Sequence, residues 1–307
     1  MATATRNQPN DAALNHQITT QAARNPLTLW HLLSLDAPTV AALWTWFIAS
    51  ANHIHLPLAS ILAMTIAVWM LYAADRLLDA RIMDTPRNVG PSTSPKIQDL
   101  EARHYFHHHH RSAFLSGMLL VSIALAILLP RLEAEAIHLY LILGGLLFGY
   151  FILIHASGSA HRLPKEIAVG LFFAAATFIP TVARRPDLRI SLLPLAILFA
   201  TLCSLNCLFI YAWEHSNQTH SSHPPHALTS FALRNLPLLT ITLIVLSVAF
   251  ALLDHQTPRL IPSAIAAAAT SLLLLHHRRH ETAQLTLRTL ADLALTPPLL
   301  ILPFLHR

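Results

Sequence analysis

The chain has 307 residues, of which 54% are hydrophobic and only 11% are charged, and its mean hydropathy is +0.51. Charged residues normally make up about a quarter of a soluble domain, so this composition excludes an ordinary soluble protein and predicts an integral membrane protein. The formal net charge of +5 and the pI near 9.7 are typical of basic loops beside anionic lipid. The sequence has no patch of interleaved basic and aromatic residues, which is the pattern that would indicate nucleic-acid binding.

The chain begins with a polar segment, residues 1–26, that lacks the apolar run of a cleavable signal peptide. We expect this segment to be a disordered cytoplasmic tail, followed by one membrane domain over residues 27–307. The two cysteines, Cys203 and Cys207, lie one helical turn apart inside an apolar run, where we expect both to be buried. The sequence therefore predicts no disulfide framework.

Nine apolar segments approach the length of roughly 20 residues that a membrane helix needs. Strand-like alternation is absent from them, so the predicted fold is an all-helical membrane bundle. Prolines near several predicted helix starts agree with this prediction. Proline lacks a backbone N–H, and in the first turn of a helix that group has no hydrogen-bond partner within the helix. The predicted spans are Leu27–Ala51, Leu56–Asp79, Ala113–Leu129, Ile137–His155, Lys165–Ala183, Leu192–Glu214, Leu236–Leu253, Leu260–Leu275 and Leu290–Leu305.

The distribution of basic residues among the loops predicts the orientation of these spans. With nine spans and the N-terminus in the cytoplasm, 14 of the 20 Lys and Arg residues fall inside, and six fall outside. The predicted outside set is Arg131, Arg184, Arg185, Arg189, Arg259 and Arg307. This asymmetry favours a cytoplasmic N-terminus, and we expect the protein in a bacterial inner membrane.

Under this topology, ionisable side chains gather at the cytoplasmic ends of the spans. They are Asp36, Asp75, Asp79, Lys165, Glu214, Arg288 and Asp292. Because charged groups at membrane depth are costly, such a gathering indicates a functional site between the helices.

Asp75 and Asp79 lie four residues apart at the end of the second predicted span. That spacing places both carboxylates on one helix face, about 5–6 Å apart, where they repel each other unless a positive group lies between them. Mg²⁺ is the natural candidate, because it binds one or two carboxylates and takes further oxygens from substrate phosphates. The alternative is an ion pair with Arg76 or another basic side chain at the helix end.

Basic side chains near this carboxylate pair are candidate ligands for a diphosphate. Arg76 and Arg81 flank the pair, and the long connection that follows carries Arg87, Lys96, Arg103 and Arg111. A solvated loop beside anionic lipid is equally compatible with these residues. The five histidines between Arg103 and Arg111 favour an interfacial helix over a metal site, because adjacent histidines point around a helix and do not converge.

Two further predicted sites have open alternatives. Lys165 begins the fifth span, where the helix dipole favours an anion, so a phosphate contact and a lipid-facing Lys are both compatible with its position. Asn206 lies about 80° around the sixth helix from Glu214, so both side chains can face one cavity. Hydrogen bonding between helices is the alternative for Asn206.

The remaining ionisable residues also have structural interpretations. Asp36 precedes Ala37-Pro38 and is predicted to cap a helix with Pro in its first turn. Arg288 and Asp292 are four residues apart and can neutralise each other.

The positions of these residues resemble the UbiA-type polyprenyltransferase family of membrane enzymes. In that family, N-D-x-x-D-x-x-x-D follows the second helix; Asp75 and Asp79 match its last two aspartates, while Leu71 and Tyr72 stand at its first two positions. Glu214 stands at the start of the second Asp-rich motif, where Asn217 and Gln218 replace the other carboxylates. Lys165 with Gly170 is similar to the K-x-x-x-x-G segment of the fifth helix.

The resemblance implies a Mg²⁺-dependent prenyltransferase that moves a prenyl group from a prenyl diphosphate to an aromatic or other lipid-soluble acceptor. It implies Asp75, Asp79 and Glu214 as metal ligands, with Glu214 also catalytic. Arg76, Arg81, Lys165 and Asn206 would then bind substrate. Membrane lipids are the other expected partners, and no protein partner is inferred.

Two other function classes remain open. The first is a transporter or a prenyl-lipid-binding protein without chemistry; the absence of an internal repeat and the gathering of polar groups at one surface favour an enzyme over a transporter. The second is a histidine-based metal carrier. It would need convergent His pairs, and the inner loops offer mainly consecutive ones.

Overall fold

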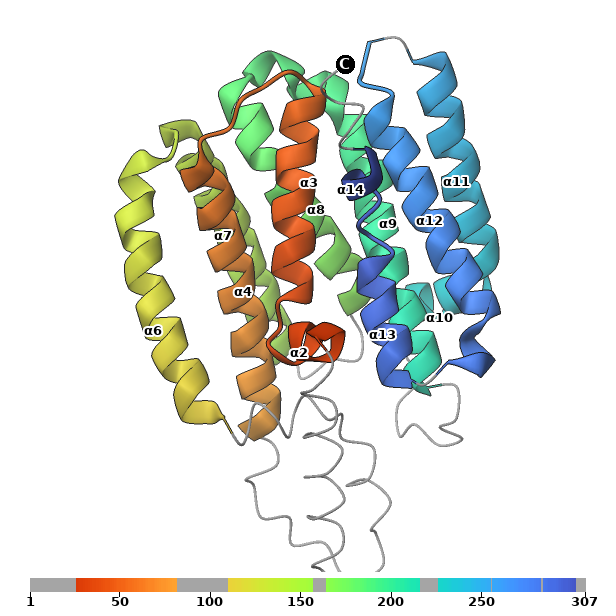
Figure 1. The fold of residues 1–307 in the computed structure, drawn as a ribbon, viewed down its shortest axis with the longest axis horizontal. Helices are drawn as coiled ribbons and strands as arrows, with labels where there is room; N and C mark the ends of the chain where they lie inside the picture. Colours follow the sequence, from red (N-terminus) through yellow and green to blue (C-terminus); the bar gives the residue numbers. More distant parts are fainter. Residues whose placement is uncertain are drawn as a thin grey trace, which may run out of the picture. The chain divides into compact units, whose positions relative to one another are not determined.

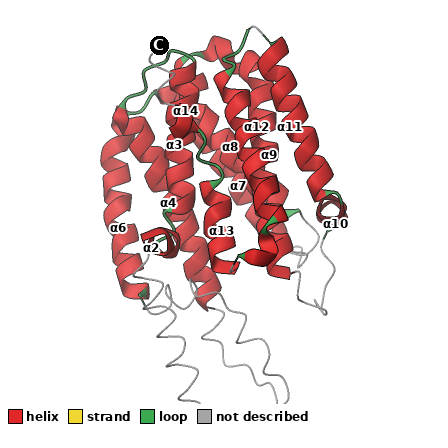
Figure 2. Ribbon diagram, turned by 45° about the vertical axis from the view of Figure 1, so that its right-hand side comes forward, coloured by secondary structure: helices red, strands yellow, loops and turns green. Residues whose placement is uncertain are grey.

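The computed structural model describes residues 26–81, 110–156, 164–215, 226–254, 256–282 and 284–301, and these residues form helices and connecting turns with no strand (Figure 2). The predicted all-helical class is therefore confirmed. The α-helices are α2 (Pro26–Leu32), α3 (Asp36–Ala51), α4 (Leu58–Arg81), α6 (Arg111–Leu128), α7 (Ala134–Ala156), α8 (Lys165–Arg184), α9 (Arg189–His215), α10 (Ala227–Arg234), α11 (Leu236–Leu253), α12 (Leu260–His277), α13 (Gln284–Leu293) and α14 (Pro298–Ile301) (Figure 1).

The chain divides into two compact units, which are described separately. Unit 1 comprises Met1–Ala37 and Ile66–Leu125, and unit 2 comprises Pro38–Thr65 and Ala126–Arg307. The division falls inside α3, α4 and α6, so chain order does not separate the units.

Aromatic packing holds the described part of unit 1 together. The Trp69 ring of α4 stacks on Phe114 of α6, with ring centroids 6.3 Å apart. Its indole N–H donates to the carbonyl of Leu33, at 3.1 Å, just after α2 ends. One tryptophan therefore joins three segments of this unit: its ring contributes apolar contact and its N–H satisfies a backbone carbonyl.

The core of unit 2 surrounds α9, which packs against α8, α11, α12 and α13 (Figure 1). Trp44, Phe199 and Phe209 are among its largest fully buried side chains. The Trp44 and Phe199 rings lie 4.3 Å apart between centroids. Because α8 and α9 are joined only by the short turn Pro186–Leu188, they run antiparallel, and the start of α8 lies at the same end as the end of α9.

Gly170 allows α8 and α9 to approach closely. A Cβ atom at this position would lie 2.5 Å from the backbone nitrogen of Ser204 and 2.8 Å from the carbonyl oxygen of Ala200. The Ser204 hydroxyl donates to Ala200 at 2.9 Å and lies 3.4 Å from the carbonyl of Ile167 on α8. The glycine predicted to belong to a site segment therefore acts here as a helix-packing residue, as small residues do between membrane helices.

Many large apolar side chains remain exposed on the helix surfaces. Leu141, Leu146 and Phe148 on α7 are at least 60% exposed, as are Leu238 and Leu252 on α11. A soluble monomer rarely exposes apolar surface on this scale. Six helices within the described residues are long and apolar enough to cross a membrane: α4, α6, α8, α9, α11 and α12. The chain is therefore an integral membrane protein.

Two of the other three predicted spans are interrupted in the structure. The first is interrupted after α2, where Ser34 adopts a φ of 55° before α3 begins at Asp36. The fourth corresponds to α7, a continuous helix of 23 residues, of which Ala134–Tyr150 is a shorter apolar stretch within the described residues. The ninth is interrupted between α13 and α14. The count of nine spans therefore remains a prediction.

The interruption of the last helix lies in the protein interior. Leu295, Pro297 and Pro298 in this segment are buried, and the Leu295 carbonyl accepts a 2.7 Å hydrogen bond from the indole N–H of Trp44. Proline cannot continue the backbone hydrogen bonding of a helix, so the Pro297-Pro298 pair explains the interruption. Non-helical backbone at membrane depth is tolerated where protein groups satisfy it, as Trp44 does here.

Candidate functional site

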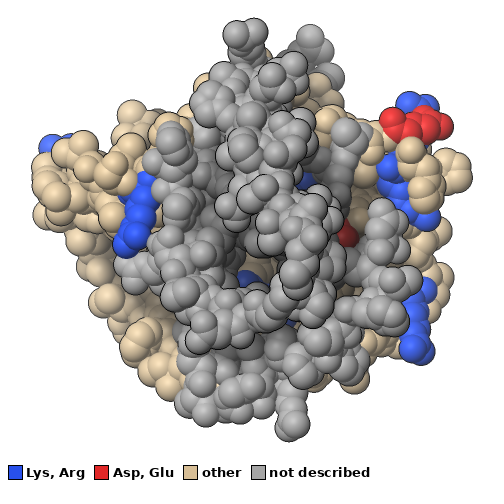
Figure 3. Space-filling view, turned by 90° about the horizontal axis from the view of Figure 1, so that it is seen from below, with Lys and Arg blue, Asp and Glu red and all other residues tan. Residues whose placement is uncertain are grey.

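The candidate site in unit 2 lies at the end of the unit where α8 begins and α9 ends. We call it the Glu214 end, defined by Lys165, Glu166, Glu214, His276 and Arg288. Figure 3 views the molecule from below Figure 1, and the basic side chains visible among its described residues lie at several separate places. Direct contacts between helices therefore define the site better than a single charged patch does.

An ion pair joins α9 to α13 at this end. The guanidinium of Arg288 donates to the carboxylate of Glu214, and the two side chains are 14% and 26% exposed. Glu214 is the last residue but one of α9, and Arg288 lies in the middle of α13. A half-buried pair of this kind neutralises both charges. The predicted metal ligand Glu214 is therefore held by a basic partner.

A second polar contact joins the same two helices deeper in the bundle. The side-chain amide of Asn206 donates from Nδ2 to Oδ1 of Asp292, at 3.1 Å. Asn206 is 6% exposed, and no donor within the described residues reaches its Oδ1 atom. Asn206 thus takes part in interhelical hydrogen bonding, the alternative left open above, and it also carries an acceptor atom that the described protein groups leave unused.

Trp213 and His276 link α9 to the end of α12. The indole N–H of Trp213 donates to Nδ1 of His276 at 3.0 Å, and the His276 ring lies 5.1 Å from that of Phe209. Because an indole only donates, Nδ1 must be unprotonated, which leaves the imidazole proton on Nε2. This contact was not anticipated, since one histidine among 21 gives no distinguishing signal in the sequence.

Lys165 and Glu166 begin α8 at the same end. Lys165 is exposed, whereas Glu166 is half-buried and accepts a 3.3 Å hydrogen bond from the hydroxyl of Thr229 on α10. The first helical turn carries the positive end of the helix dipole, so an anion near Lys165 would be favoured. The predicted phosphate contact at Lys165 stays a prediction.

The predicted carboxylates of the second span lie in unit 1, on α4. Asp75 accepts a 3.1 Å hydrogen bond from the neighbouring Arg76, whose guanidinium lies 5.9 Å from the centroid of the Tyr72 ring. The Asp75 side chain is 39% exposed and that of Arg76 is 12% exposed. Asp79 and Arg81 belong to the same helix, but their side chains lie outside the described residues.

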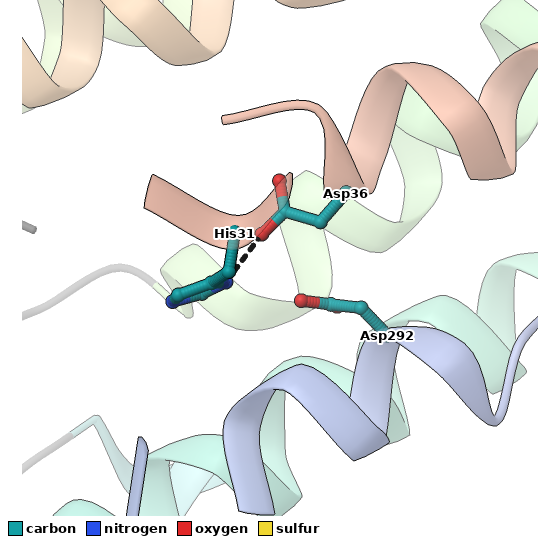
Figure 4. Close-up of side chains that lie close together, drawn as sticks. All are labelled: His31, Asp36 and Asp292. Atoms are coloured by element: carbon teal, nitrogen blue, oxygen red, sulfur yellow. Dashed lines mark hydrogen bonds and ion pairs between the residues drawn. The ribbon is translucent and has the colours of Figure 1, made fainter. Parts of the chain in front are cut away.

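Asp36, also in unit 1, is the first residue of α3 and so lies at the predicted helix start. Its Oδ1 accepts a 2.9 Å hydrogen bond from the backbone N–H of Ala37 at the start of α3. Its Oδ2 lies 2.8 Å from Nδ1 of the buried His31 (Figure 4). The histidine partner was missed because it precedes Asp36 by five positions across an interruption in the helix.

The structure thus brings together some of the predicted site residues. In unit 2 it places Asn206 and Glu214 on α9 opposite Asp292 and Arg288 on α13. In unit 1 it pairs Asp75 with Arg76. The basic loop with Arg87, Lys96 and Arg103, the histidines at 107–109, and Asn217 and Gln218 lie outside the described residues.

No protein-family model, curated protein or solved structure matches the chain.

Proposed function

We propose that the protein is a membrane prenyltransferase that uses Mg²⁺ and moves a prenyl group from a prenyl diphosphate to a lipid-soluble acceptor. The observation that carries this proposal is the Glu214 end, where acidic and basic side chains are half-buried at the end of apolar helices. Charged groups are costly where they are half-buried between membrane helices, so we expect them to serve a function. A substrate with a charged headgroup and an apolar chain would contact both the charged end and the apolar helices. The resemblance to the UbiA-type family supports the same reading.

Asp75 is the described residue that best fits a Mg²⁺ ligand. Its carboxylate is more than one-third exposed and lies on the helix that also carries Asp79. Hard carboxylate oxygens are the ligands that Mg²⁺ prefers. When bound, the ion would neutralise diphosphate charge as the allylic C–O bond breaks. Glu214 fits a ligand role less well, because Arg288 already neutralises it.

The basic residues of the chain would hold the diphosphate. A guanidinium carries five N–H groups and can bind carboxylate and phosphate oxygens at once, so Arg288 is the proposed diphosphate contact at the Glu214 end. Glu214 would orient this guanidinium, in addition to its predicted catalytic role. Lys165 at the start of α8 is the other predicted contact in unit 2, and Arg76 and Arg81 on α4 are the predicted contacts in unit 1. The apolar helices would exclude water from the reacting chain.

The neutralised Glu214 also favours a second candidate, a prenyl-lipid-binding protein without catalysis. The second motif lacks carboxylates whose negative charge two metal ions would need. The one carboxylate that it keeps, Glu214, forms an ion pair with Arg288 and is therefore neutralised. Diphosphate binding would then persist without turnover.

Turnover by the purified protein separates these two functions. The protein in lipid nanodiscs is incubated with radiolabelled prenyl diphosphates, Mg²⁺ and pooled aromatic acceptors, and lipid extracts are analysed for a labelled product. We expect a product that requires Mg²⁺ and that is lost in Asp75→Asn, because this variant removes one ligand charge. Asp187→Asn, at an exposed carboxylate on the opposite end of α8, is the matched control and should retain activity.

Two results of these measurements would contradict the proposal. Binding of prenyl diphosphate without any product would favour the non-catalytic function. Equal diphosphate binding by wild type and Asp75→Asn would assign Asp75 to its ion pair with Arg76. The proposed location is a bacterial inner membrane with a cytoplasmic N-terminus, which places the diphosphate site on the cytoplasmic side.

A further inference from the structure

We infer that a groove between α8 and α9 binds one acyl chain of an anionic phospholipid, with the phosphate of the headgroup beside Arg189. The groove lies in unit 2 and has a volume of about 260 Å³. Apolar side chains line it except at Arg189, which lies at the end of the unit opposite the Glu214 end. The inference goes beyond the proposed function, because it involves neither the prenyl diphosphate nor Mg²⁺.

The groove begins where the close contact between α8 and α9 stops. Its lining ends at Leu171 on α8 and at Ala200 on α9, next to the contact of Gly170 with Ser204. Short side chains on both helices leave a space between them that longer side chains would fill. They are Ala174, Ala175, Ala196 and Ala200.

The shape of α8 beside the groove is held by a neighbouring helix. Pro180 lies inside α8 and has no N–H to donate to the carbonyl of Ala176. That carbonyl instead accepts a 3.2 Å hydrogen bond from the hydroxyl of Tyr140 on α7. Because these contacts involve protein groups alone, the groove is preformed, as most ligand sites are.

The length of the groove matches one leaflet of a bilayer. Its lining runs from Leu171 to Val182 on α8 and from Arg189 to Ala200 on α9, which is about 16 Å along each helix. The hydrocarbon core of a bilayer is about 30 Å thick, so the groove spans about half of it. This is the depth that a chain reaches when its headgroup lies at the membrane surface.

The side of the groove is open to the bilayer. Leu171, Leu193 and Ile197 line it and are each more than half exposed, on two helices that are apolar enough to span a membrane. A lipid chain can therefore enter sideways. A 16 Å length of α-helix, about 10 Å in diameter, would occupy several times the volume of the groove. The volume therefore favours a single hydrocarbon chain over a partner helix.

Arg189 supplies the contact for the headgroup. It is exposed, and its Nη2 donates a 2.6 Å hydrogen bond to Oε1 of Glu135. A guanidinium carries five N–H groups and can bind carboxylate and phosphate oxygens at once.

The charge around Arg189 favours an anionic headgroup over a zwitterionic one. The α6–α7 and α8–α9 connections, with the helix ends beside them, carry more basic than acidic residues. The basic residues are Arg131, Arg184, Arg185 and Arg189, and the acidic residues are Glu133, Glu135 and Asp187. A surface with an excess of positive charge attracts anionic lipid.

The experiment measures lipid bound to the whole purified protein. Phosphatidylglycerol or phosphatidylcholine is titrated into the protein in detergent, and native mass spectrometry counts the lipids on each chain. We expect phosphatidylglycerol binding to saturate at one lipid per chain, with an affinity about fivefold higher than that of phosphatidylcholine. Phosphatidylglycerol with a photoreactive group in its acyl chain should cross-link to residues 171–182 and 189–200.

Matched variants test the groove and the headgroup contact separately. Ala175→Phe and Ala196→Phe fill the groove from its two walls and should each abolish saturable binding. Ala267→Phe makes the same change at an exposed position of α12 outside the groove and should bind lipid as wild type does. Arg189→Gln should remove the preference for phosphatidylglycerol, whereas Arg184→Gln, at an exposed arginine that does not line the groove, should retain it.

Defined results would overturn the inference. Equal lipid binding by Ala175→Phe, Ala196→Phe and Ala267→Phe would place the lipid elsewhere, and equal affinities of wild type for the two lipids would reject the anionic headgroup. Cross-links between two chains that are lost in Ala196→Phe would assign the groove to a second copy. Displacement of the lipid by prenyl diphosphate would assign it to the substrate of the proposed function. Lipid binding without prenyl transfer would support this site and reject only that function.

Discussion

The two ends of the unit 2 bundle carry ion pairs of different kinds. At the end opposite the Glu214 end, which we call the Arg189 end, three exposed pairs join residues in or beside short turns: Arg184–Glu133, Arg185–Asp187 and Arg189–Glu135. Hydrogen bonds from the Arg185 guanidinium to the Asp187 carboxylate raise the pKa of Arg185 above its ordinary value. At the Glu214 end, the polar contacts are half-buried and join helices that are far apart in the sequence.

The exposed pairs at the Arg189 end neutralise surface charges, whereas the half-buried contacts at the Glu214 end position helices relative to one another. Exposed ion pairs contribute at most about 1 kcal/mol each, because water competes for both partners. Half-buried pairs have paid a desolvation cost, so they often add little net stability but are costly to break. The Arg189 end therefore resembles an ordinary membrane–water boundary, whereas the contacts of the Glu214 end fix the relative positions of α9, α12 and α13.

The largest expected contrast between the ends is their accessibility from the two sides of the membrane. In a background with Cys203 and Cys207 replaced by Ala, Arg185→Cys at the Arg189 end and Glu281→Cys, just beyond α12, should react with an impermeant thiol reagent from opposite sides. The proposed orientation makes Glu281→Cys the cytoplasmic one. Vesicles of known sidedness provide the measurement. Reaction of both positions from the same side would contradict three membrane-spanning helices between them, α9, α11 and α12.

The next largest effect should come from the close contact between α8 and α9. Gly170→Ala puts a methyl group against the backbone of Ser204 and Ala200, which cannot move without separating the helices. We expect the free energy of unfolding to fall by about 3 kcal/mol, the upper part of the range for overpacking. Gly144→Ala on α7 is the control, because no atom lies within 4 Å of its added Cβ. Equal stability of the two variants would show that the helices are less closely packed.

The smallest expected effect is on the free energy of unfolding when a single ion pair is broken at either end. Glu214→Gln should lower the free energy of unfolding by about 2 kcal/mol, because it leaves Arg288 half-buried without its carboxylate. Glu135→Gln at the Arg189 end should lower it by less than about 1 kcal/mol, and high salt should remove that difference. Unfolding in denaturing detergent measures both.

The double variant Glu214→Gln with Arg288→Met provides the check on this comparison. It should regain part of the stability lost in Glu214→Gln, because the unpaired guanidinium is removed as well. No recovery would indicate that Arg288 does not destabilise the single variant through its charge.

The sequence allowed the helical class and the positions of most membrane helices to be predicted, because long apolar runs bounded by polar loops have few alternatives in a bilayer. It did not reveal where spans are interrupted. The interruption before Asp36 depends on the left-handed backbone of Ser34 and on a hydrogen bond to His31, neither of which apolar patterning reports. Cys203 is buried as predicted, whereas Cys207 is only half-buried.

The candidate site was predictable as a set of unusual residues but not as a set of contacts. Glu214 and Asn206 were distinguished by their cost inside an apolar span. Their partners on α13 were not distinguished, because Arg288 and Asp292 are four residues apart and could also pair with each other on one helix. Contacts between helices some 80 positions apart depend on packing angles that the residue pattern does not specify.

The polar contacts of α13 have a consequence for how the protein enters the membrane. Arg288 and Asp292 each add roughly 2.5–3.5 kcal/mol to the insertion of an isolated helix, so α13 is too polar to leave the translocon for lipid by itself. Its partners Glu214 and Asn206 belong to α9, which is synthesised earlier. We therefore expect the predicted span that overlaps α13 to insert by packing against α9, as a step of tertiary assembly as much as of partitioning into lipid.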